Sequence, residues 1–260
     1  MKLRFVIILS LVGINCLFSG CIEDDMSPGN TVSAFPPFDG STWEDPGIII
    51  DSDPSIYDTL FYRGQENRQM FDRRINRWQM FYAHVFEASY EKGKTIDIRV
   101  NPEFSLEEAE AYALEYAYYV GQIPAFLLED VQTVSIHDGL ENFGGGTNDL
   151  LVHVQQGEIY LKFGNMIETL IHEAAHVSLD EEIYADPAWK EAVEKDPTFI
   201  TTYAKDFPNR EDVAESILLY LAATCKVDRI SESMLNKINS AMPNRIQYFA
   251  AQNYDLYPLE

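Results

Sequence analysis

Thr169–His176 reads TLIHEAAH, and this stretch decides which fold and chemistry the chain is expected to have. His172 and His176 are four residues apart, so on a helix both imidazoles can reach one Zn²⁺ ion. Glu173 is turned about 100° around the helix axis, where it can reach a water on the metal rather than the metal. With 5 histidines in 260 residues, such a string arises by chance in roughly one sequence per hundred or fewer. The stretch predicts a metal-binding helix.

The flanking residues predict that this helix runs from about residue 165 to residue 179. Asn165 and Glu168 have the spacing of an N-cap residue and its N3 partner. Glu158–Phe163, just before them, is expected to be a short strand. Apolar residues at helical spacing give the helix a stripe for burial: Ile167, Leu170, Ile171 and Ala174.

The sequence upstream alternates strand and helix patterns. Phe86–Tyr90 and Thr95–Val100 are typical of a β-hairpin, with a helix through residues 72–90 as the alternative. Ser105 and Glu108 form a capping box, which predicts a helix that ends near Gly121.

Two further β-rich segments, Val131–His137 and Leu150–Val154, are separated by a turn-forming stretch that contains Gly144–Gly146. After Leu179 the chain is expected to be wholly helical. The breaks between these helices are expected at prolines, namely Pro187, Pro197, Pro208 and Pro243. The patterns predict an α+β fold with a small mixed sheet, an active-site helix and a helical C-terminal subdomain.

A catalytic zinc site needs a third protein ligand and an open position for water. Pro208 and the residue after it are expected to begin a helix on which Glu211 and Glu215 share one face. A carboxylate pair at this spacing suits one ligand and one acceptor for the N–H of a ligand imidazole. Asp180 is the competing ligand, but one straight helix cannot easily place three residues around a tetrahedral ion. Asp180 is better suited to accept a hydrogen bond from the outer nitrogen of a ligand imidazole, or to end the helix.

The order of HExxH, a tyrosine and an E-x-x-x-E string before an Ala- and Leu-rich helix resembles the gluzincin metallopeptidases. A well-known protein with this order is the catalytic domain of anthrax lethal factor. The resemblance implies a zincin-like fold in which Glu211 is the third zinc ligand and Glu215 a carboxylate behind the ligands. It also implies that the hydroxyl of Tyr203 stabilises the tetrahedral oxyanion, with Tyr220 as the alternative.

A second resemblance runs over roughly residues 71–222. The chain is similar to a group of secreted bacterial lipoproteins described as zinc-binding metallopeptidases. The similarity lies in six segments: Phe71–Arg74, Val100–Phe104, Ile136–Gly139, Phe143–Gly146, His172–Asp180 and Tyr203–Ser216. The resemblance implies membership of that group and says little about the substrate.

The amino terminus has the pattern of a secretion signal. Lys2 and Arg4 precede the apolar run Phe5–Leu17, and small residues follow before Cys21. Leu17–Cys21 resembles a bacterial lipobox, which predicts a signal peptide over residues 1–20 and a lipid on Cys21. The alternative is an ordinary signal peptide with an incidental cysteine.

Composition divides the remaining chain into two parts. Residues 21–53 are rich in Pro, Gly, Ser, Asp and Glu and are predicted to be a flexible tether, followed by a metallopeptidase domain over residues 54–260. Cys225 would be the single unmodified cysteine, so no disulfide framework is expected. The predicted location is extracytoplasmic, with the protein lipid-anchored to the bacterial cell envelope, at the outer membrane or the cell surface.

The charge of the chain excludes one class of partner. It has 19 Lys and Arg against 42 Asp and Glu, a formal net charge of -23. A nucleic acid would be repelled by this charge rather than bound, so none is expected as a partner. The acidity also raises the hypothesis of an acidic cleft rim that favours basic peptides. The sequence does not determine the oligomeric state.

These features predict a zinc metallopeptidase that hydrolyses a peptide or protein substrate, with Glu173 as general base. One alternative is a cell-envelope binding protein with an inactive or structural zinc site. Another is a zinc peptidase that acts on peptidoglycan cross-links, which are also amide bonds.

Two strand histidines and the glycine run can each have a structural or a functional role. His137 and His153 are expected to be strand histidines with satisfied hydrogen bonds, the alternative being contact with substrate. Gly144–Gly146 either forms a tight turn or lets a substrate backbone approach the strand at Leu150–Val154.

Overall fold

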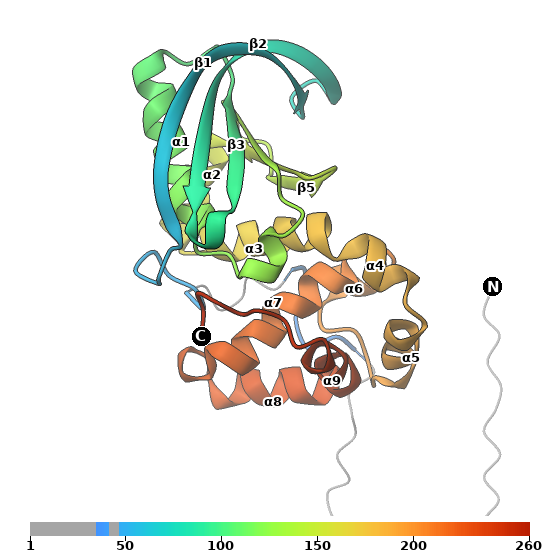
Figure 1. Ribbon diagram of the computed structural model, residues 1–260. Coiled ribbons are helices and arrows are strands. Elements are labelled where there is room, and N and C mark those ends of the chain that lie inside the picture. Colours follow the sequence, from blue (N-terminus) through green and yellow to red (C-terminus); the bar gives the residue numbers. More distant parts are fainter. Residues whose placement is uncertain (1–34, 42–46) are drawn as a thin grey trace, which may run out of the picture. The chain divides into compact units, whose positions relative to one another are not determined.

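The sheet of this protein has six strands within residues 35–41 and 47–260, which the computed structural model describes (Figure 1). The strands are β1 (Tyr57–Asp72), β2 (Arg77–Tyr90), β3 (Thr95–Val100), β4 (Thr133–His137), β5 (Gly144–Gly146) and β6 (Asp149–His153). Their order across the sheet is β1-β2-β3-β4-β6-β5. Neighbours β3/β4 and β4/β6 are parallel, and the other neighbouring pairs are antiparallel. The sheet is therefore mixed, as predicted.

The helices occupy the crossover between β3 and β4 and nearly all of the chain after β6. They are α1 (Leu106–Val120), α2 (Val154–Phe163), α3 (Met166–Ser178), α4 (Asp180–Ala185), α5 (Pro187–Lys195), α6 (Thr202–Asp206), α7 (Asp212–Cys225), α8 (Glu232–Ala241) and α9 (Pro243–Ala251), with short 3₁₀ turns η1 (Glu91–Gly93), η2 (Ala125–Leu128) and η3 (Val227–Arg229). None of the helices in this part of the chain is both long and apolar enough to span a membrane.

Helix α3 lies at the centre of the fold. It packs against β5 and β6 on the side of the sheet and against α7 on the other side (Figure 1). The predicted stripe, which includes Leu170 and Ala174, is fully buried, but so are Glu168 and Thr169 outside the stripe. The α+β class and the helical C-terminal part are confirmed, because every element after β6 is a helix in the described residues.

The first two strands form a long hairpin that extends beyond the rest of the sheet (Figure 1). The predicted hairpin of Phe86–Tyr90 and Thr95–Val100 is confirmed as β2 and β3, but β2 begins nine residues earlier, at Arg77. The alternative helix through residues 72–90 is wrong, because β1 pairs with β2 along their whole length and satisfies the backbone there.

The predicted strand Glu158–Phe163 is wrong, because these residues belong to α2. Val154, Gly157 and Tyr160 are the buried residues of this helix, and their three-residue spacing is helical. Gly164 ends the helix in the left-handed conformation, with φ 74°, as a C-terminal glycine does.

The two predicted helix starts have different outcomes. Ser105 and Glu108 form the predicted capping box at α1, and Gly121 is the C-cap residue of that helix. Asn165 is the N-cap residue of α3, but its side chain makes no capping hydrogen bond. Glu168 does not reach back to the helix start either. Its Oε1 instead accepts backbone N–H groups of Gly47–Ile49, at 3.1, 2.8 and 3.4 Å.

The predicted tether through residue 53 is too long. Phe38, Ile48 and Ile49 are buried in the core, where Glu168 binds the backbone of the latter pair. Asp53 is 4% exposed and forms ion pairs with Lys226 and Arg229. Composition failed here because a few apolar residues in a polar segment are enough to hold it on the core. The predicted signal peptide over residues 1–20 and the predicted lipidation site Cys21 lie outside the described residues.

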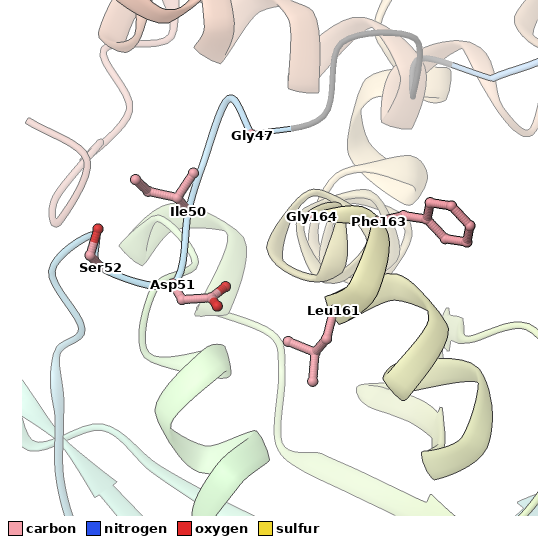
Figure 2. A pocket seen from close by; sticks show the side chains of 7 residues that line it. All are labelled: Gly47, Ile50, Asp51, Ser52, Leu161, Phe163 and Gly164. Carbon is pink, nitrogen blue, oxygen red and sulfur yellow. The ribbon is translucent and has the colours of Figure 1, made fainter.

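Figure 2 shows a shallow pocket of about 400 Å³ where residues 50–52 approach the C-terminal end of α2. Ile50 and Leu161 give it apolar walls, and Asp51 is its one titratable side chain. The pocket marks the place at which the amino-terminal segment crosses the helix that precedes α3.

A buried arginine connects the C-terminal helices. Arg245 of α9 is 0% exposed, and its Nη1 lies 2.9 Å from Oδ2 of Asp196. Its Nε donates to Oδ2 of Asp212, the first residue of α7, at 3.1 Å. Burying these charges is costly, but removing one partner leaves the others uncompensated.

We therefore expect Arg245→Ala to lower the free energy of unfolding by about 3–5 kcal/mol, because two buried carboxylates lose their cation. Urea denaturation followed by circular dichroism measures this loss. Lys92→Ala is the control, since it breaks a fully exposed ion pair with Asp255 and should be nearly neutral. Equal effects of the two substitutions would contradict the importance of the buried cluster.

His137 and His153 lie at the carboxyl ends of β4 and β6, and both are fully buried. Their rings stack with centroids 5.8 Å apart. Nδ1 of His137 lies 2.8 Å from Nδ2 of Asn101, whereas neither ring nitrogen of His153 has a hydrogen bond among the described residues. Nε2 of His153 lies 4.0 Å from Oε2 of Glu141, which is its charged neighbour among the described residues.

Burial lowers the pKa of His137 to about 4, against an ordinary value of 6.5. Between pH 6.5 and pH 4 the unfolded chain binds the proton and the folded chain does not, so stability falls as the pH falls. We expect this histidine to make folding about 2 kcal/mol less favourable at pH 5 than at pH 7. Urea denaturation of wild type and His137→Gln at both pH values isolates this contribution. An identical pH dependence of the two proteins would refute it.

Candidate metal centre

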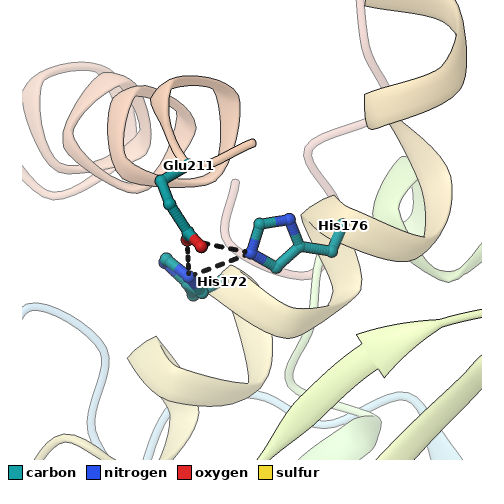
Figure 3. Close-up of side chains that lie close together, drawn as sticks. All are labelled: His172, His176 and Glu211. Atoms are coloured by element: carbon teal, nitrogen blue, oxygen red, sulfur yellow. Dashed lines mark hydrogen bonds and ion pairs between the residues drawn. The ribbon is translucent and has the colours of Figure 1, made fainter. Parts of the chain in front are cut away.

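Helix α3 and the residue before α7 bring three potential ligands together (Figure 3). Nε2 of His172 and Nε2 of His176 lie 3.2 Å apart. Oε2 of Glu211 lies 3.4 Å from the first nitrogen and 3.3 Å from the second. The three atoms form a nearly equilateral triangle.

This triangle has the dimensions of one face of a small coordination tetrahedron. Ligand atoms at bond lengths of about 2.0–2.1 Å around a tetrahedral ion lie about 3.3 Å from one another. His172 and Glu211 are 6% and 5% exposed, so the triangle lies at the base of the site. The residues present therefore fit a metal ion with two nitrogen ligands and one oxygen ligand.

Glu211 is positioned by the turn before α7. The predicted helix start at Pro208 is wrong, because α7 begins at Asp212 and Glu211 is its N-cap residue. The N–H of Glu211 donates to the carbonyl of Phe207, at 2.9 Å. Asp212, the next residue, is held by Arg245 as described above. Glu211 is thus attached to a helix end that the buried ion pair of Asp212 and Arg245 holds in place.

The second nitrogen of each imidazole faces a carboxylate. Nδ1 of His176 lies 2.8 Å from Oδ2 of Asp180. Nδ1 of His172 lies 3.5 Å from Oε1 of Glu215 and makes no hydrogen bond among the described residues. Because these carboxylates are on the outer side of the rings, they favour the tautomers that leave both Nε2 atoms for a metal. Asp180 therefore contacts the outer nitrogen of His176, and its carboxylate is not part of the triangle.

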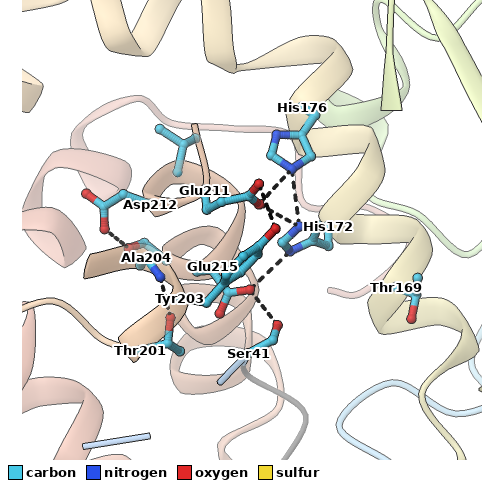
Figure 4. A network of polar contacts seen from close by, with 12 residues as sticks. Ser41, Thr169, His172, His176, Thr201, Tyr203, Ala204, Glu211, Asp212 and Glu215 are labelled. Carbon is cyan, nitrogen blue, oxygen red and sulfur yellow. Dashed lines mark hydrogen bonds and ion pairs between the residues drawn. The ribbon is translucent and has the colours of Figure 1, made fainter. Parts of the chain in front are cut away.

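Glu215 is completely buried below the site (Figure 4). Its Oε1 accepts a hydrogen bond from Oγ of Ser41, at 2.5 Å. Burial raises the pKa of Glu215, against the opposing effect of His172. The segment around Ser41, expected to be a tether, is held in place because the N–H of Tyr203 donates to the carbonyl of Gly40. This segment therefore forms part of the site.

The electrostatics of the cluster favour a cation. Burial acts to raise the pKa of Glu211, but His172 and His176 outweigh it and hold that pKa far below its ordinary value. Burial acts to lower the pKa of His176, but Asp180 and Glu211 outweigh it and raise that pKa to about 10. Carboxylates thus stabilise positive charge at the centre, whether it comes from a proton or from a metal ion.

Glu173 and Tyr203 both line the cleft above the triangle. The phenol of Tyr203 donates to Oε1 of Glu211 at 2.9 Å, and Nε of Arg210 donates to the same oxygen at 2.6 Å. Oε1 is thus held by two donors while Oε2 faces the imidazoles. Burial raises the pKa of Tyr203, and the hydrogen bond to Glu211 raises it further, so the phenol keeps its proton. Tyr220, the alternative, packs against Phe249 and does not line the cleft.

The cleft has a volume of about 820 Å³, and β5 forms one of its walls. Of the two interpretations of Gly144–Gly146, the tight turn is wrong, because these residues pair with β6 as the edge strand of the sheet. A side chain at Gly145 would collide with the backbone of Glu173. Only glycine lets this strand lie directly against the metal-binding helix.

Several residues of the cleft were not found from the sequence. They come from distant parts of the chain: Ser41, Arg73, Asn142, Tyr160 and Arg210. Arg73 and Arg210 lie in segments that carry the second resemblance, but no role was predicted for either. Arg210 adjoins Glu211, which is the one signal that could have indicated it. The others are brought together only by the packing of the hairpin, β5 and α2 around α3.

We expect His172→Ala and Glu211→Ala to lose bound metal, because each removes one corner of the triangle. Asp180→Ala should retain metal with about 10–100-fold weaker affinity, since it removes only the partner of Nδ1 of His176. Metal per chain, measured by mass spectrometry after dialysis, distinguishes these outcomes. Loss of metal in Asp180→Ala with retention in Glu211→Ala would overturn the choice of third ligand.

In comparisons with known proteins, the chain matches no protein-family model, no curated protein and no solved structure. The function therefore has to be argued from the geometry of this site.

Proposed function

We propose that this protein is a zinc-dependent metallopeptidase of the gluzincin type. The observation that supports the proposal is the triangle of His172, His176 and Glu211, whose edges of 3.2–3.4 Å suit a tetrahedral ion with one open position. A structural zinc site would have all four positions filled by protein. Here the three ligands border a cleft instead.

The donor set favours zinc among common metal ions. Two imidazoles and one carboxylate form a known catalytic zinc set, whereas calcium takes six to eight oxygen ligands. Zinc held in this way lowers the pKa of a water to about 7 and polarises a peptide carbonyl. Because other transition metals bind the same donors, metal analysis is part of the test below.

Glu173 is the proposed general base. It follows His172 directly on α3, it lines the cleft, and it takes no part in the triangle. Its carboxylate can accept the proton of the attacking water and pass it to the leaving amine. Tyr203 is the proposed donor to the oxyanion, because its protonated phenol lies on the cleft wall beside Glu211. Its one proton is donated to Oε1 of Glu211 in this structure, so in this role the phenol would turn from Glu211 to the substrate.

A peptide is the proposed substrate because the cleft has a strand edge beside the metal ligands. β5 is paired with β6 on one side only and has no side chains along its length. An extended peptide can add to such an edge through backbone hydrogen bonds. One interpretation of the sequence placed the substrate beside the strand at Leu150–Val154. In the structure β5 pairs with that strand and takes its place at the edge of the sheet, so the peptide is proposed to pair with β5 instead.

The fold supports the same proposal. A mixed sheet lies on one side of α3, its antiparallel edge strand lies nearest the HExxH helix, and the third ligand comes from the helical C-terminal part. We propose that this arrangement is zincin-like. With the export signal and lipidation predicted at residues 1–21, the enzyme is proposed to act outside the cytoplasm, anchored to the cell envelope.

We expect Glu173→Gln to lower peptide hydrolysis by at least about 10²–10⁴-fold while the protein keeps its zinc, because only proton transfer is removed. Glu181→Gln is the matched control, since it changes an exposed carboxylate on α4. The assay is digestion of a peptide library by zinc-loaded protein, with a chelator arm. Full activity in Glu173→Gln, or no chelator-sensitive hydrolysis by the wild type, would refute the proposal.

A further inference from the structure

The tip of the long hairpin brings an arginine into the cleft. Arg73 follows β1 and lines the same cleft as the metal ligands. Its Nη1 donates to the carbonyl of Phe143, at 2.8 Å, just before β5 begins. A guanidinium has five N–H donors, and this contact uses one of them.

Arg73 differs from its neighbours because it has no carboxylate partner. Arg74, the next residue, is paired with Asp72 and Glu103, at 3.0 and 2.8 Å. Arg210, the other arginine of the cleft, is paired with Glu211 at 2.6 Å. Arg73 makes no ion pair with any residue in the described part of the chain. Its charge and its remaining donors are thus not neutralised by the protein.

The first glycine of β5 makes room for this guanidinium. A Cβ atom at Gly144 would collide with Nη2 of Arg73. Gly145, the next residue, lies against the backbone of Glu173. Successive residues of a strand point to opposite faces, so the guanidinium lies on one face of β5 and α3 on the other. An extended peptide paired with β5 also presents alternate side chains to the two faces, so a side chain that faces Arg73 belongs to a residue next to one that faces α3.

The carboxylates that line the described part of the cleft lie at the metal centre. They are Glu173, Asp180 and Glu211, and all three belong to the metal centre or its general base. Away from that centre, the charged side chain that lines the cleft among the described residues is Arg73, since Arg210 is paired with Glu211. The net charge of -23 therefore does not by itself decide which charge the cleft prefers.

We propose that Arg73 forms a carboxylate-binding subsite, so that the cleft selects peptides with an acidic group next to the scissile bond. The inference rests on the proposed peptidase function for its position in the cleft. The carboxylate can come from an Asp or Glu side chain or from the C-terminus of the peptide. The planar guanidinium can bind either in a two-pronged arrangement.

The negative charge of the whole protein acts against this preference at long range. At an ionic strength of 0.15 M charges are screened beyond about 8 Å, whereas a contact pair in a cleft is screened much less. The preference is therefore best measured at this ionic strength, with peptides that differ in one group only.

The first test uses two peptide libraries that are identical except that Gln replaces Glu at every position. Wild-type protein with zinc should cleave the Glu library with kcat/KM about 10-fold higher or more, as expected for a charge-assisted pair. In Arg73→Gln the ratio of the two rates should fall to about 1, whereas Arg73→Lys should keep part of it. A further arm compares C-terminal acids with C-terminal amides and identifies the source of the carboxylate.

Two variants separate selectivity from structure. Arg77→Gln removes an exposed arginine of the same hairpin that does not line the cleft, so the ratio should stay at the wild-type value. Gly144→Ala leaves Arg73 in the chain but displaces its guanidinium, so the ratio should fall as in Arg73→Gln. A merely structural role of Arg73 would change both rates together and leave their ratio unaltered.

Binding tests the inference without turnover. Fluorescence anisotropy of labelled Glu and Gln peptides with zinc-loaded Glu173→Gln should show the same selectivity. Equal affinities, or a ratio that Arg73→Gln does not change, would overturn the subsite. If the wild type cleaves no peptide but its acid selectivity depends on Arg73, the peptidase proposal fails and the carboxylate site remains.

Discussion

The packing of α3 against α7 is the constraint on which the rest of this structure depends. The two histidines come from one helix, and Glu211, the third potential ligand, is the residue immediately before the other. A shift of either helix by 1 Å would be large against a triangle whose edges are 3.2–3.4 Å. The fold therefore has to fix the start of α7 relative to the middle of α3 more tightly than hydrophobic packing alone requires.

Buried charges provide this fixation at both helices. Arg245 holds Asp212 at the start of α7, and Glu168 of α3 binds the backbone of residues 47–49. Ser41 then reaches Glu215 from the amino-terminal side. Buried polar groups are weak contributors to stability but strong determinants of geometry when each has its partner. Their directionality suits a site in which three atoms must face one point.

The sequence predicted those parts of the fold and site that depend on short-range spacing. The i, i+4 histidines and the capping box at Ser105 follow from helix geometry within a few residues. Glu211 was identified by its spacing to Glu215, although the helix that was expected to contain it begins one residue later. Glu158–Phe163 was misassigned because a short apolar run does not distinguish a strand from a buried helix. Ser41 has no local pattern that indicates it, and Arg73 lies in a segment that carries a resemblance but implies no role for it. Only tertiary packing brings the two residues to the cleft.

The glycine strand explains why recognition in this cleft has to come from distant residues. β5 cannot bear a side chain at Gly145, which lies against the backbone of α3, and a side chain at Gly144 would displace the guanidinium of Arg73. The strand can therefore offer a substrate only backbone groups, which do not distinguish one side chain from another. Selectivity for a substrate side chain would therefore come from protein side chains that reach the cleft from other elements. The hairpin brings Arg73 to the cleft, and Arg73 has no ion-pair partner among the described residues. In the proposed enzyme the HExxH helix would supply the reaction, and the hairpin, a separate element, would supply the preference.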